Sequence, residues 1–294
     1  MRVASINSNN QNLSFDGYKY RKKPFPVYLN PIKYQMDKLF ERSITVSRNR
    51  IFPIAEDLKP YLEEVPLKTK DVDTYAYDII NKNASSKYVL MLHGLGQNIS
   101  ALQPLYREII NKTDYSILAS EYRGFGKNPP ATMSNETFLK DTQAALDYLV
   151  NDKGIEPKDI CVIGHSFGGF TASQLVKKNP DIARLILVSS VDNLGDEMLR
   201  SSAAKHVSPV LLKLLKNISF LRSYLKSLFS TKEELKHSSV PVDIIHSMND
   251  RVVSYKSAKY LAEDSHNLHS IHLLKTGGHG MEEKKISEIV SLLK

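Results

Sequence analysis

Short apolar runs alternate with amphipathic segments over residues 63–294. Segment 87–94, KYVLMLHG, is almost continuously apolar, which is typical of a strand covered on both faces of a parallel sheet. The same patterns predict further strands at 65–71, 72–80, 115–122, 159–164, 183–190, 241–250 and 270–280. They predict helices at 101–111, 137–151 and 167–178, and one helix after each of the last two strands. This alternation indicates βαβ units, so we expect an α/β fold with a mostly parallel, doubly wound sheet.

The first 62 residues differ from the rest of the chain. Residues 1–16 are rich in Asn, Ser and Gln, and so few apolar side chains cannot offset chain entropy, which predicts a flexible tail. Segment 30–43 has helical spacing, and its apolar residues close to one face are Ile32, Met36, Leu39 and Phe40. We therefore divide the chain into an N-terminal extension, residues 1–62, and an α/β domain, residues 63–294.

One connection, about residues 192–238, is far longer than a usual link between helix and strand. It follows the sixth predicted strand, and segment 207–230 within it is helical in pattern, apolar and cationic. Because ligands bind at the carboxyl edge of such a sheet, we predict a helical lid over the site. Its apolar residues either line an acyl channel or pack on the sheet: Leu211, Leu212, Leu215, Phe220, Leu225 and Phe229.

The composition is that of an ordinary globular protein, with 41% hydrophobic and 24% charged residues. The net charge of +8 fits either a lysine-rich surface or attraction to an anionic partner. The single cysteine, Cys161, excludes an internal disulfide. No secretory signal peptide or transmembrane stretch is visible, so we expect a cytoplasmic location, with export that reads no N-terminal signal as the alternative. We expect no nucleic-acid partner, and the sequence leaves the oligomeric state open.

The motif GHSFGG, residues 164–169, lies between a predicted strand and a predicted helix. It fits G-x-S-x-G in the strand–turn–helix context that this motif requires, which makes Ser166 a candidate nucleophile. The alternative is a simple tight turn. A serine hydroxyl needs a base to become a good nucleophile, and the base needs a carboxylate to orient it.

Asp250 and His279 supply those partners in the required chain order. Each follows a predicted strand, and glycines surround the histidine at positions 277, 278 and 280. Taken singly, the aspartate could cap a helix and the histidine could lie on the surface, but together with Ser166 they predict a catalytic triad. Asp192 also follows a strand end and is the rival acid.

Acyl transfer also requires donors for the oxyanion of the tetrahedral intermediate. The loop HGLGQN, residues 93–98, leaves a central strand with two glycines, which points to the backbone N–H of Leu95. The second expected donor is the backbone N–H of Phe167, directly after the nucleophile. We identify neither a metal-ligand cluster nor a nucleotide-binding glycine loop, and we expect no cofactor.

These motifs together resemble the α/β-hydrolase superfamily. The matching stretches occur in the family's order and spacing: HGLG, EYRGFGKN, GHSFGG, the strand that ends in Asp250, and GGHG. The similarity covers about residues 63–294 and is greatest to the lysophospholipase-like, monoacylglycerol-lipase-like and serine-aminopeptidase-like branch. It implies the α/β-hydrolase fold, no cofactor, and the site residues named above. Glu121 departs from the pattern, because many relatives have Asp there.

The sequence therefore favours a serine hydrolase of carboxylic esters or thioesters with a lipophilic acyl group. The alternatives are a peptidase of the serine-aminopeptidase type and a non-catalytic binding protein on the same fold. Seven cations lie along the predicted lid: Lys205, Lys213, Lys216, Arg222, Lys226, Lys232 and Lys236. They suit either a solvated lid or peripheral contact with an anionic membrane that carries a lipid acyl substrate.

Overall fold

A computed structural model describes residues 12–15, 18–21, 50–83, 86–131, 134–194, 196–197 and 229–294. The predicted helix at 30–43 lies outside these ranges. So does most of the predicted lid, including five of its six named apolar residues and five of its seven cations. The described residues include both ends of the long connection, with Asp192 at its start and Phe229 near its end.

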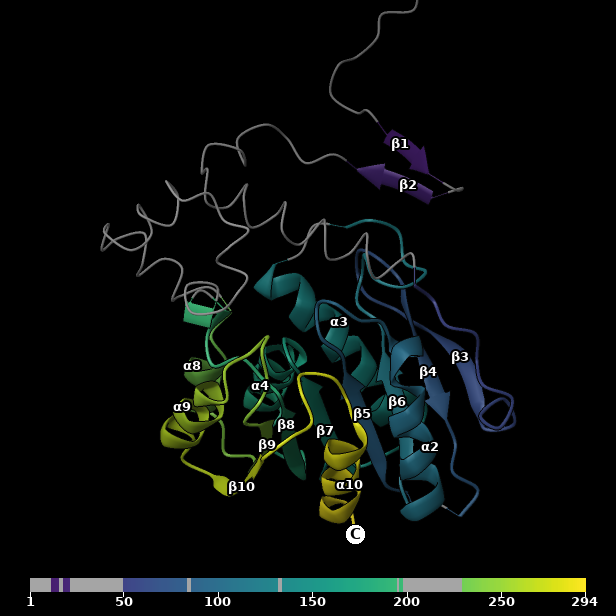
Figure 1. Cartoon of the computed structure of the whole chain (residues 1–294). Coiled ribbons are helices and arrows are strands. Elements are labelled where there is room, and N and C mark those ends of the chain that lie inside the picture. The colour runs from purple at the N-terminus through teal and green to yellow at the C-terminus, as the bar shows by residue number, and fades with distance from the viewer. Residues whose placement is uncertain are drawn as a thin grey trace, which may run out of the picture.

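An eight-stranded sheet forms the centre of the α/β domain, in the order β10-β9-β8-β7-β5-β6-β4-β3 (Figure 1). The pairs from β6 across to β10 are parallel, and β4 is antiparallel to both β6 and β3. The strands are β3 (Leu62–Leu67), β4 (Thr74–Ile79), β5 (Tyr88–Leu92), β6 (Ser116–Ser120), β7 (Ile160–His165), β8 (Arg184–Val188), β9 (Val242–Ser247) and β10 (Leu268–Leu274). The fold is thus the predicted mostly parallel α/β-hydrolase sheet.

Helices cover both faces of this sheet. One face is covered by α2 (Gln103–Lys112) and α10 (Glu283–Leu292), which contact each other. The other face is covered by α3 (Asn135–Asp147), α4 (Gly168–Lys178), α8 (Thr231–Leu235) and α9 (Lys256–Asp264). Short turns of 3-10 or π helix complete the connections: Ile99–Leu102, Tyr148–Asp152 and Pro157–Asp159.

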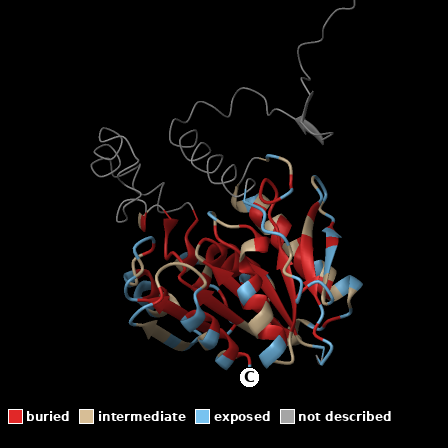
Figure 2. Ribbon diagram, turned by 45° about the vertical axis from the view of Figure 1, so that its right-hand side comes forward, coloured by how far each residue is buried: buried red, intermediate tan, exposed pale blue. Residues whose placement is uncertain are grey.

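The central strands contribute side chains to the cores on both faces of the sheet, because successive side chains point to opposite faces. In β5, Leu90 and Leu92 belong to the core under α3 and α4, whereas Val89 and Met91 belong to the core under α2 and α10. All four are fully buried, which explains why the segment reads as one apolar run. Figure 2 shows these strands as a buried centre with exposed residues at the periphery.

The helices begin where capping residues allow. Helix α3 starts at Asn135, two residues before the predicted start, because Ser134 and Thr137 form a capping box ahead of it. In that box the Ser134 hydroxyl accepts from the Thr137 backbone N–H, and the Thr137 hydroxyl accepts from the Ser134 backbone N–H. The predicted boundary was therefore late by half a turn.

Two parts of the N-terminal extension are described. Strands β1 (Asn12–Phe15) and β2 (Tyr18–Arg21) form an antiparallel hairpin, where we expected a flexible tail as far as residue 16. The sequence Asp16-Gly17 between the two strands is typical of two-residue hairpin turns. Residues 50–61 pack on the α/β domain, with Leu58 fully buried.

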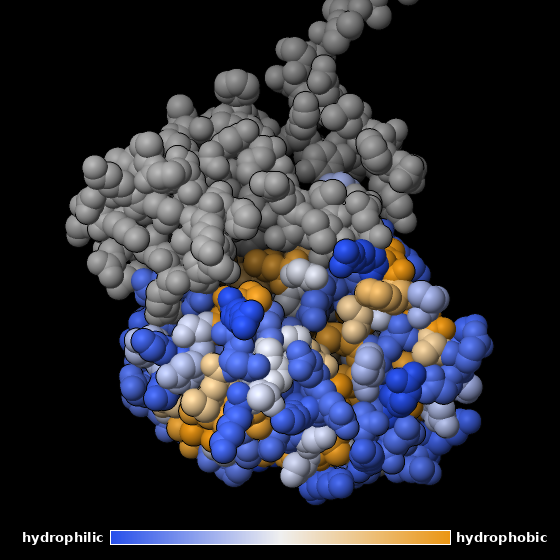
Figure 3. All heavy atoms as spheres, viewed as in Figure 1, coloured by the Kyte–Doolittle hydropathy of each residue, from blue (hydrophilic) through white to orange (hydrophobic). Residues whose placement is uncertain are grey.

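Figure 3 shows that side chains on the described surface are mostly hydrophilic in this view, with apolar patches among them. Exposed large apolar side chains include Phe52, Met248 and Val252. Among the helices in the described ranges, none combines the length and apolar character needed to cross a bilayer.

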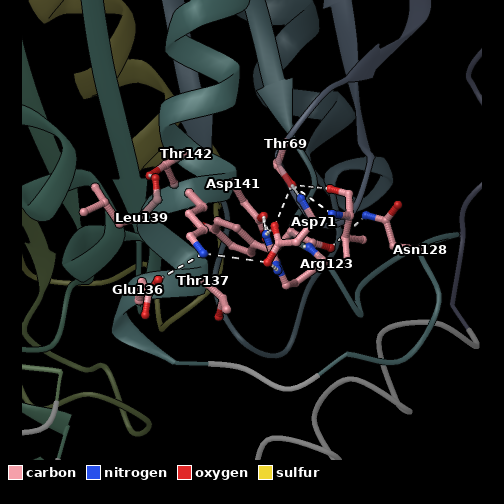
Figure 4. A network of polar contacts seen from close by, with 12 residues as sticks. Thr69, Asp71, Arg123, Asn128, Glu136, Thr137, Leu139, Asp141 and Thr142 are labelled. Carbon is pink, nitrogen blue, oxygen red and sulfur yellow. Dashed lines mark hydrogen bonds and ion pairs between the residues drawn. The ribbon is translucent and has the colours of Figure 1, made fainter. Parts of the chain in front are cut away.

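A buried ion-pair network fastens the loop after β6 to α3 and to the β3–β4 turn (Figure 4). The Arg123 guanidinium donates to the fully buried Asp141 carboxylate, with Nη2–Oδ1 at 2.6 Å and Nε–Oδ1 at 2.9 Å. Arg123 also donates to Asp71 at 3.0 and 3.2 Å. These hydrogen bonds lower the pKa of Asp71 to about 2. The network fixes the EYRGFG segment, which supports the site described below.

We predict unequal losses of stability when the two carboxylates are neutralised. Asp141→Asn removes the buried counter-charge of Arg123 and should lower the free energy of unfolding by about 3–5 kcal/mol. Asp71→Asn should lower it by about 0–1 kcal/mol, because that side chain is 43% exposed. Denaturant unfolding of both variants measures the difference, and equal losses would contradict it.

Candidate active site

The predicted site residues meet at the carboxyl ends of neighbouring strands. The 93–96 loop follows β5, Ser166 follows β7, Asp250 follows β9, and His279 lies between β10 and α10. Since β5 and β7 are adjacent and parallel, their following loops lie side by side. The order of the sheet therefore gathers residues that are far apart in the sequence.

Ser166 occupies a strained corner between β7 and α4. Its φ of 55° lies in the left-handed region, which is unfavourable for a residue with a Cβ. The corner is held by hydrogen bonds from the Ser166 N–H to the Val188 carbonyl, at 2.9 Å, and from the Gly169 N–H to the Ser166 carbonyl, at 3.1 Å. A Cβ on Gly164 would come within 2.5 Å of the Gly168 carbonyl oxygen, and one on Gly168 would overlap the Leu92 carbonyl. Both glycines are thus required by close packing.

His279 bridges Ser166 and Asp250. Its Nε2 lies 3.0 Å from Ser166 Oγ, and its Nδ1 lies 2.8 Å from Asp250 Oδ2. Because an ionised carboxylate only accepts, Nδ1 carries the proton and Nε2 has a free lone pair directed at the serine hydroxyl. This is the arrangement in which an imidazole can remove the hydroxyl proton. The His279 side chain is 21% exposed, so the site is open to solvent.

The Asp250 carboxylate is fully buried and surrounded by donors. Oδ1 accepts from the backbone N–H groups of Val252, at 2.8 Å, and Val253, at 2.9 Å. His246 Nε2 lies 3.4 Å from Oδ2 and 3.1 Å from the Val253 carbonyl. Burial alone would raise the pKa of Asp250, but the hydrogen bonds from His246, His279 and Val253 outweigh it and hold the pKa well below its usual value. Asp250 therefore remains ionised as the partner of His279.

Asp192, the rival acid, has a different partner. It is buried and accepts a hydrogen bond from the Ser257 hydroxyl on α9, at 2.8 Å. Both ring nitrogens of His279 are occupied by Ser166 and Asp250. The structure thus brings Asp250 to the histidine, as expected, and assigns Asp192 to the packing of α9.

His165 links three loops of the site. Its Nε2 lies 2.9 Å from the His279 carbonyl oxygen, and its Nδ1 lies 2.7 Å from Gln97 Oε1. Burial, reinforced by the nearby His279 ring, lowers the pKa of His165 to about 3. The ring is therefore neutral and carries one N–H, so it can donate to only one of its two acceptors, Gln97 Oε1 and the His279 carbonyl oxygen. His165 thus connects the loops of Gln97 and His279 as a neutral ring.

The loop of residues 93–96 passes directly beside the nucleophile. A Cβ on Gly94 would lie 2.9 Å from Ser166 Cβ, so Leu95 follows the point of closest approach. Below it, the fully buried His93 and Glu121 side chains meet at 2.6 Å between Nε2 and Oε1. Glu121 Oε2 also accepts from the Ile99 N–H at 3.1 Å. Glu121 thus anchors both ends of this loop. Phe167, the other expected oxyanion donor, is the N-cap of α4.

Two residues next to the triad were missed from the sequence. They are His246 and Lys285, neither of which we singled out in the sequence. His246 lies within β9, four residues before Asp250, so its spacing from the acid was visible in the sequence. Lys285 gave no local signal, since it lies in an ordinary charged run, EEKK. Within the described ranges, no group of His, Cys, Asp and Glu has a metal-binding arrangement.

Comparison with known proteins identifies the family. The profile of Hydrolase_4, described as "Serine aminopeptidase, S33", matches residues 83–235, more than half of the chain. The chain therefore belongs to this family of α/β hydrolases. Its match includes the 93–96 loop and the Ser166 corner, and it ends before Asp250 and His279.

Individual relatives are distant. A protein of Acanthamoeba polyphaga mimivirus named as an alpha/beta hydrolase, L404, is 22% identical over 206 residues, which is 69% of this chain and 71% of that protein. The mouse sn-1-specific diacylglycerol lipase ABHD11 is 28% identical over 122 residues, covering 41% of this chain and 38% of the lipase. A multifunctional-autoprocessing repeats-in-toxin of Vibrio cholerae is 36% identical over 93 residues, covering 32% of this chain and 2% of the toxin. The chain thus spans only a small part of some relatives.

Solved structures show the same fold. A Pyrococcus furiosus esterase superposes with a TM-score of 0.65 at 19% identity, covering 84% of this chain and 96% of the esterase. An alpha-beta hydrolase from Vibrio vulnificus superposes with a TM-score of 0.69 at 19% identity, covering 90% and 93%.

We predict that the two candidate acids differ in their effect on turnover. Asp250→Asn should lower kcat by about 10³–10⁴-fold, because the neutral amide neither fixes the tautomer of His279 nor stabilises its cation. Asp192→Asn should leave kcat within about threefold, measured where both variants are folded by circular dichroism. Since the pKa of Asp250 is held low, protonation of this group should cause no loss of wild-type activity in mildly acidic buffer. A larger loss from Asp192→Asn would reverse the assignment.

Proposed function

We propose that this chain is a serine hydrolase that cleaves a carboxylic ester or thioester through an acyl-enzyme on Ser166. The observation that carries the proposal is the hydrogen-bonded relay from Ser166 Oγ through His279 to Asp250. Ser166 holds the nucleophile position, His279 that of the general base and acid, and Asp250 that of the orienting carboxylate.

The steps follow from this geometry. His279 Nε2 takes the Ser166 hydroxyl proton as Oγ attacks the substrate carbonyl carbon. The resulting imidazolium is stabilised by the ionised Asp250 and then gives its proton to the leaving alkoxide or thiolate. A water molecule, activated by His279 in the same way, attacks the acyl carbon and releases the acid. Ser166 regains its proton at the end of the cycle.

The backbone N–H groups of Leu95 and Phe167 are the proposed oxyanion donors. Phe167 precedes α4, whose N-terminal end carries partial positive charge. Leu95 follows Gly94, which packs against Ser166. Donors held in this way stabilise charge that develops in the transition state without reorganisation.

A lipophilic acyl group is favoured by the side chains around the nucleophile. Phe167, next to Ser166, belongs to a cluster of buried aromatic rings with Phe138 at 4.9 Å, Phe229 at 5.3 Å and Phe170 at 5.6 Å between centroids. The lipase and esterase titles of the relatives agree with this chemistry. The family's description also names an aminopeptidase, which makes a peptide substrate the second candidate.

We predict that Ser166→Ala abolishes both labelling by a fluorophosphonate and hydrolysis of p-nitrophenyl esters. The fold should be retained, because the strain of the corner lies in the backbone and not in the hydroxyl. Ser291→Ala, an exposed change on α10, is the control and should behave as wild type. Retention of more than a few per cent of turnover in Ser166→Ala would contradict the nucleophile assignment.

Substrate class is tested with the wild-type protein. Turnover of p-nitrophenyl esters should rise with acyl length, and peptides with a free amino terminus should not be cleaved. Cleavage of such peptides with no ester preference would favour the peptidase.

A further inference from the structure

The segment that carries His279 is a loop of glycines between β10 and α10. Gly277, with φ of 133°, and Gly278, with φ of 51°, have backbone conformations that favour glycine. Glycine-rich backbone is costly to order, because it loses more conformational freedom than any other residue type. The position of the imidazole therefore depends on what holds this loop.

Lys285 contacts the loop from below. It lies in the first turn of α10 and is fully buried. Its ammonium Nζ donates to the carbonyl oxygens of Gly277 at 3.1 Å, Gly278 at 2.6 Å and Gly280 at 2.8 Å. An ammonium group has three N–H donors, so each donor has one acceptor. These carbonyls flank His279 on both sides.

Burying a lysine side chain at this position costs desolvation free energy. Charged side chains are almost never fully buried without a partner, and the other buried residues of α10 are apolar: Ile286, Ile289 and Val290. Within the described residues, no ion pair joins Lys285 to a carboxylate. An apolar side chain at this position would pack the helix at a lower desolvation cost. The three hydrogen bonds to loop carbonyls therefore explain why a lysine is buried here.

Other side chains contact the loop at single backbone atoms. The Gly278 N–H donates to Asn249 Oδ1 at 3.0 Å, and His165 Nε2 lies 2.9 Å from the His279 carbonyl oxygen. A surface cavity of about 400 Å³ is lined by residues of the loop and its neighbours: Asn249, Thr276, Gly277, Gly278, Glu282, Glu283 and Lys284. The Lys285 ammonium contacts three of the loop's carbonyls, so it supplies a large share of the loop's restraint.

We propose that Lys285 is a positioning residue that holds the backbone of the His279 loop so that the imidazole reaches both Ser166 and Asp250. The inference rests on the proposed function, because it assigns no separate chemistry to the lysine. Loss of the ammonium lowers the fraction of molecules in which the base is in place. It therefore lowers kcat and the rate of Ser166 acylation, and it leaves substrate affinity almost unchanged.

The charge on Lys285 gives an independent readout. Burial lowers the pKa of Lys285 below its usual value of 10.5, and the negative charges of Asp250 and Glu282 partly oppose this effect. The positive charge of Lys285 also helps to lower the pKa of His165. The neutral amine has two N–H donors, so deprotonation leaves one loop carbonyl without a partner. Raising the pH should thus reduce kcat reversibly as Lys285 loses its proton.

The test compares Lys285→Met with Lys284→Met. Methionine keeps most of the buried volume and removes the charge, whereas Lys284 is exposed and its Nζ donates to the Thr276 hydroxyl. Lys285→Met should lower kcat for a p-nitrophenyl ester, and the maximal rate of fluorophosphonate labelling, by about 10- to 100-fold, with KM within twofold. Lys284→Met should match wild type in both.

Two outcomes would overturn the inference while leaving the proposed function intact. One is wild-type kcat in a folded Lys285→Met, and the other is a rise in KM with kcat unchanged. If Lys285→Met does not fold, the wild-type pH profile decides: kcat must fall reversibly as the pH is raised toward 10.5, with KM constant, and a flat profile overturns the inference. Failure of wild type itself to label would instead overturn the proposed function.

Discussion

The hydrogen-bonded bridge that His279 makes between Ser166 and Asp250 is the interaction on which the whole site depends. The three residues come from three loops, and no two of them are closer than 29 residues in the sequence. The bridge exists because parallel strands β7, β9 and β10 end at one edge of the sheet. The sheet order thus sets the coarse position of each group, and local hydrogen bonds must set the last few tenths of an ångström.

Those local hydrogen bonds come from buried side chains below the loops. His165 ties the loop of His279 to Gln97, Glu121 ties the 93–96 loop to the start of the next helix, and His246 borders the Asp250 carboxylate. Each of these groups is buried, so water competes weakly for its partners. The His279 side chain above these groups is 21% exposed. A nucleophile, base and acid held in this way need little reorganisation when charge develops.

The chain's local signals were sufficient for the sheet and for the three central residues. Apolar runs such as 87–94 indicate buried parallel strands. The glycines that the corner at Ser166 requires are visible in the sequence as the G-x-S-x-G motif. Asp250 and Asp192 both follow strand ends between Ser166 and His279, so chain order did not separate them, and the folded geometry brings Asp250 to the histidine. Contacts formed only in the folded chain had no comparable pattern in the sequence. Lys285 looks like any surface lysine in EEKK, and its role depends on three backbone carbonyls that only the folded loop brings together.

The central claim is that Ser166 forms a covalent acyl intermediate. The most direct measurement is rapid acid quenching during turnover of a slowly hydrolysed ester, followed by mass spectrometry of peptides from the quenched protein. The account predicts an acyl adduct on the peptide that contains Ser166, formed in an initial burst and lost as turnover ends. Turnover without any adduct, or an adduct on a different residue, would contradict it.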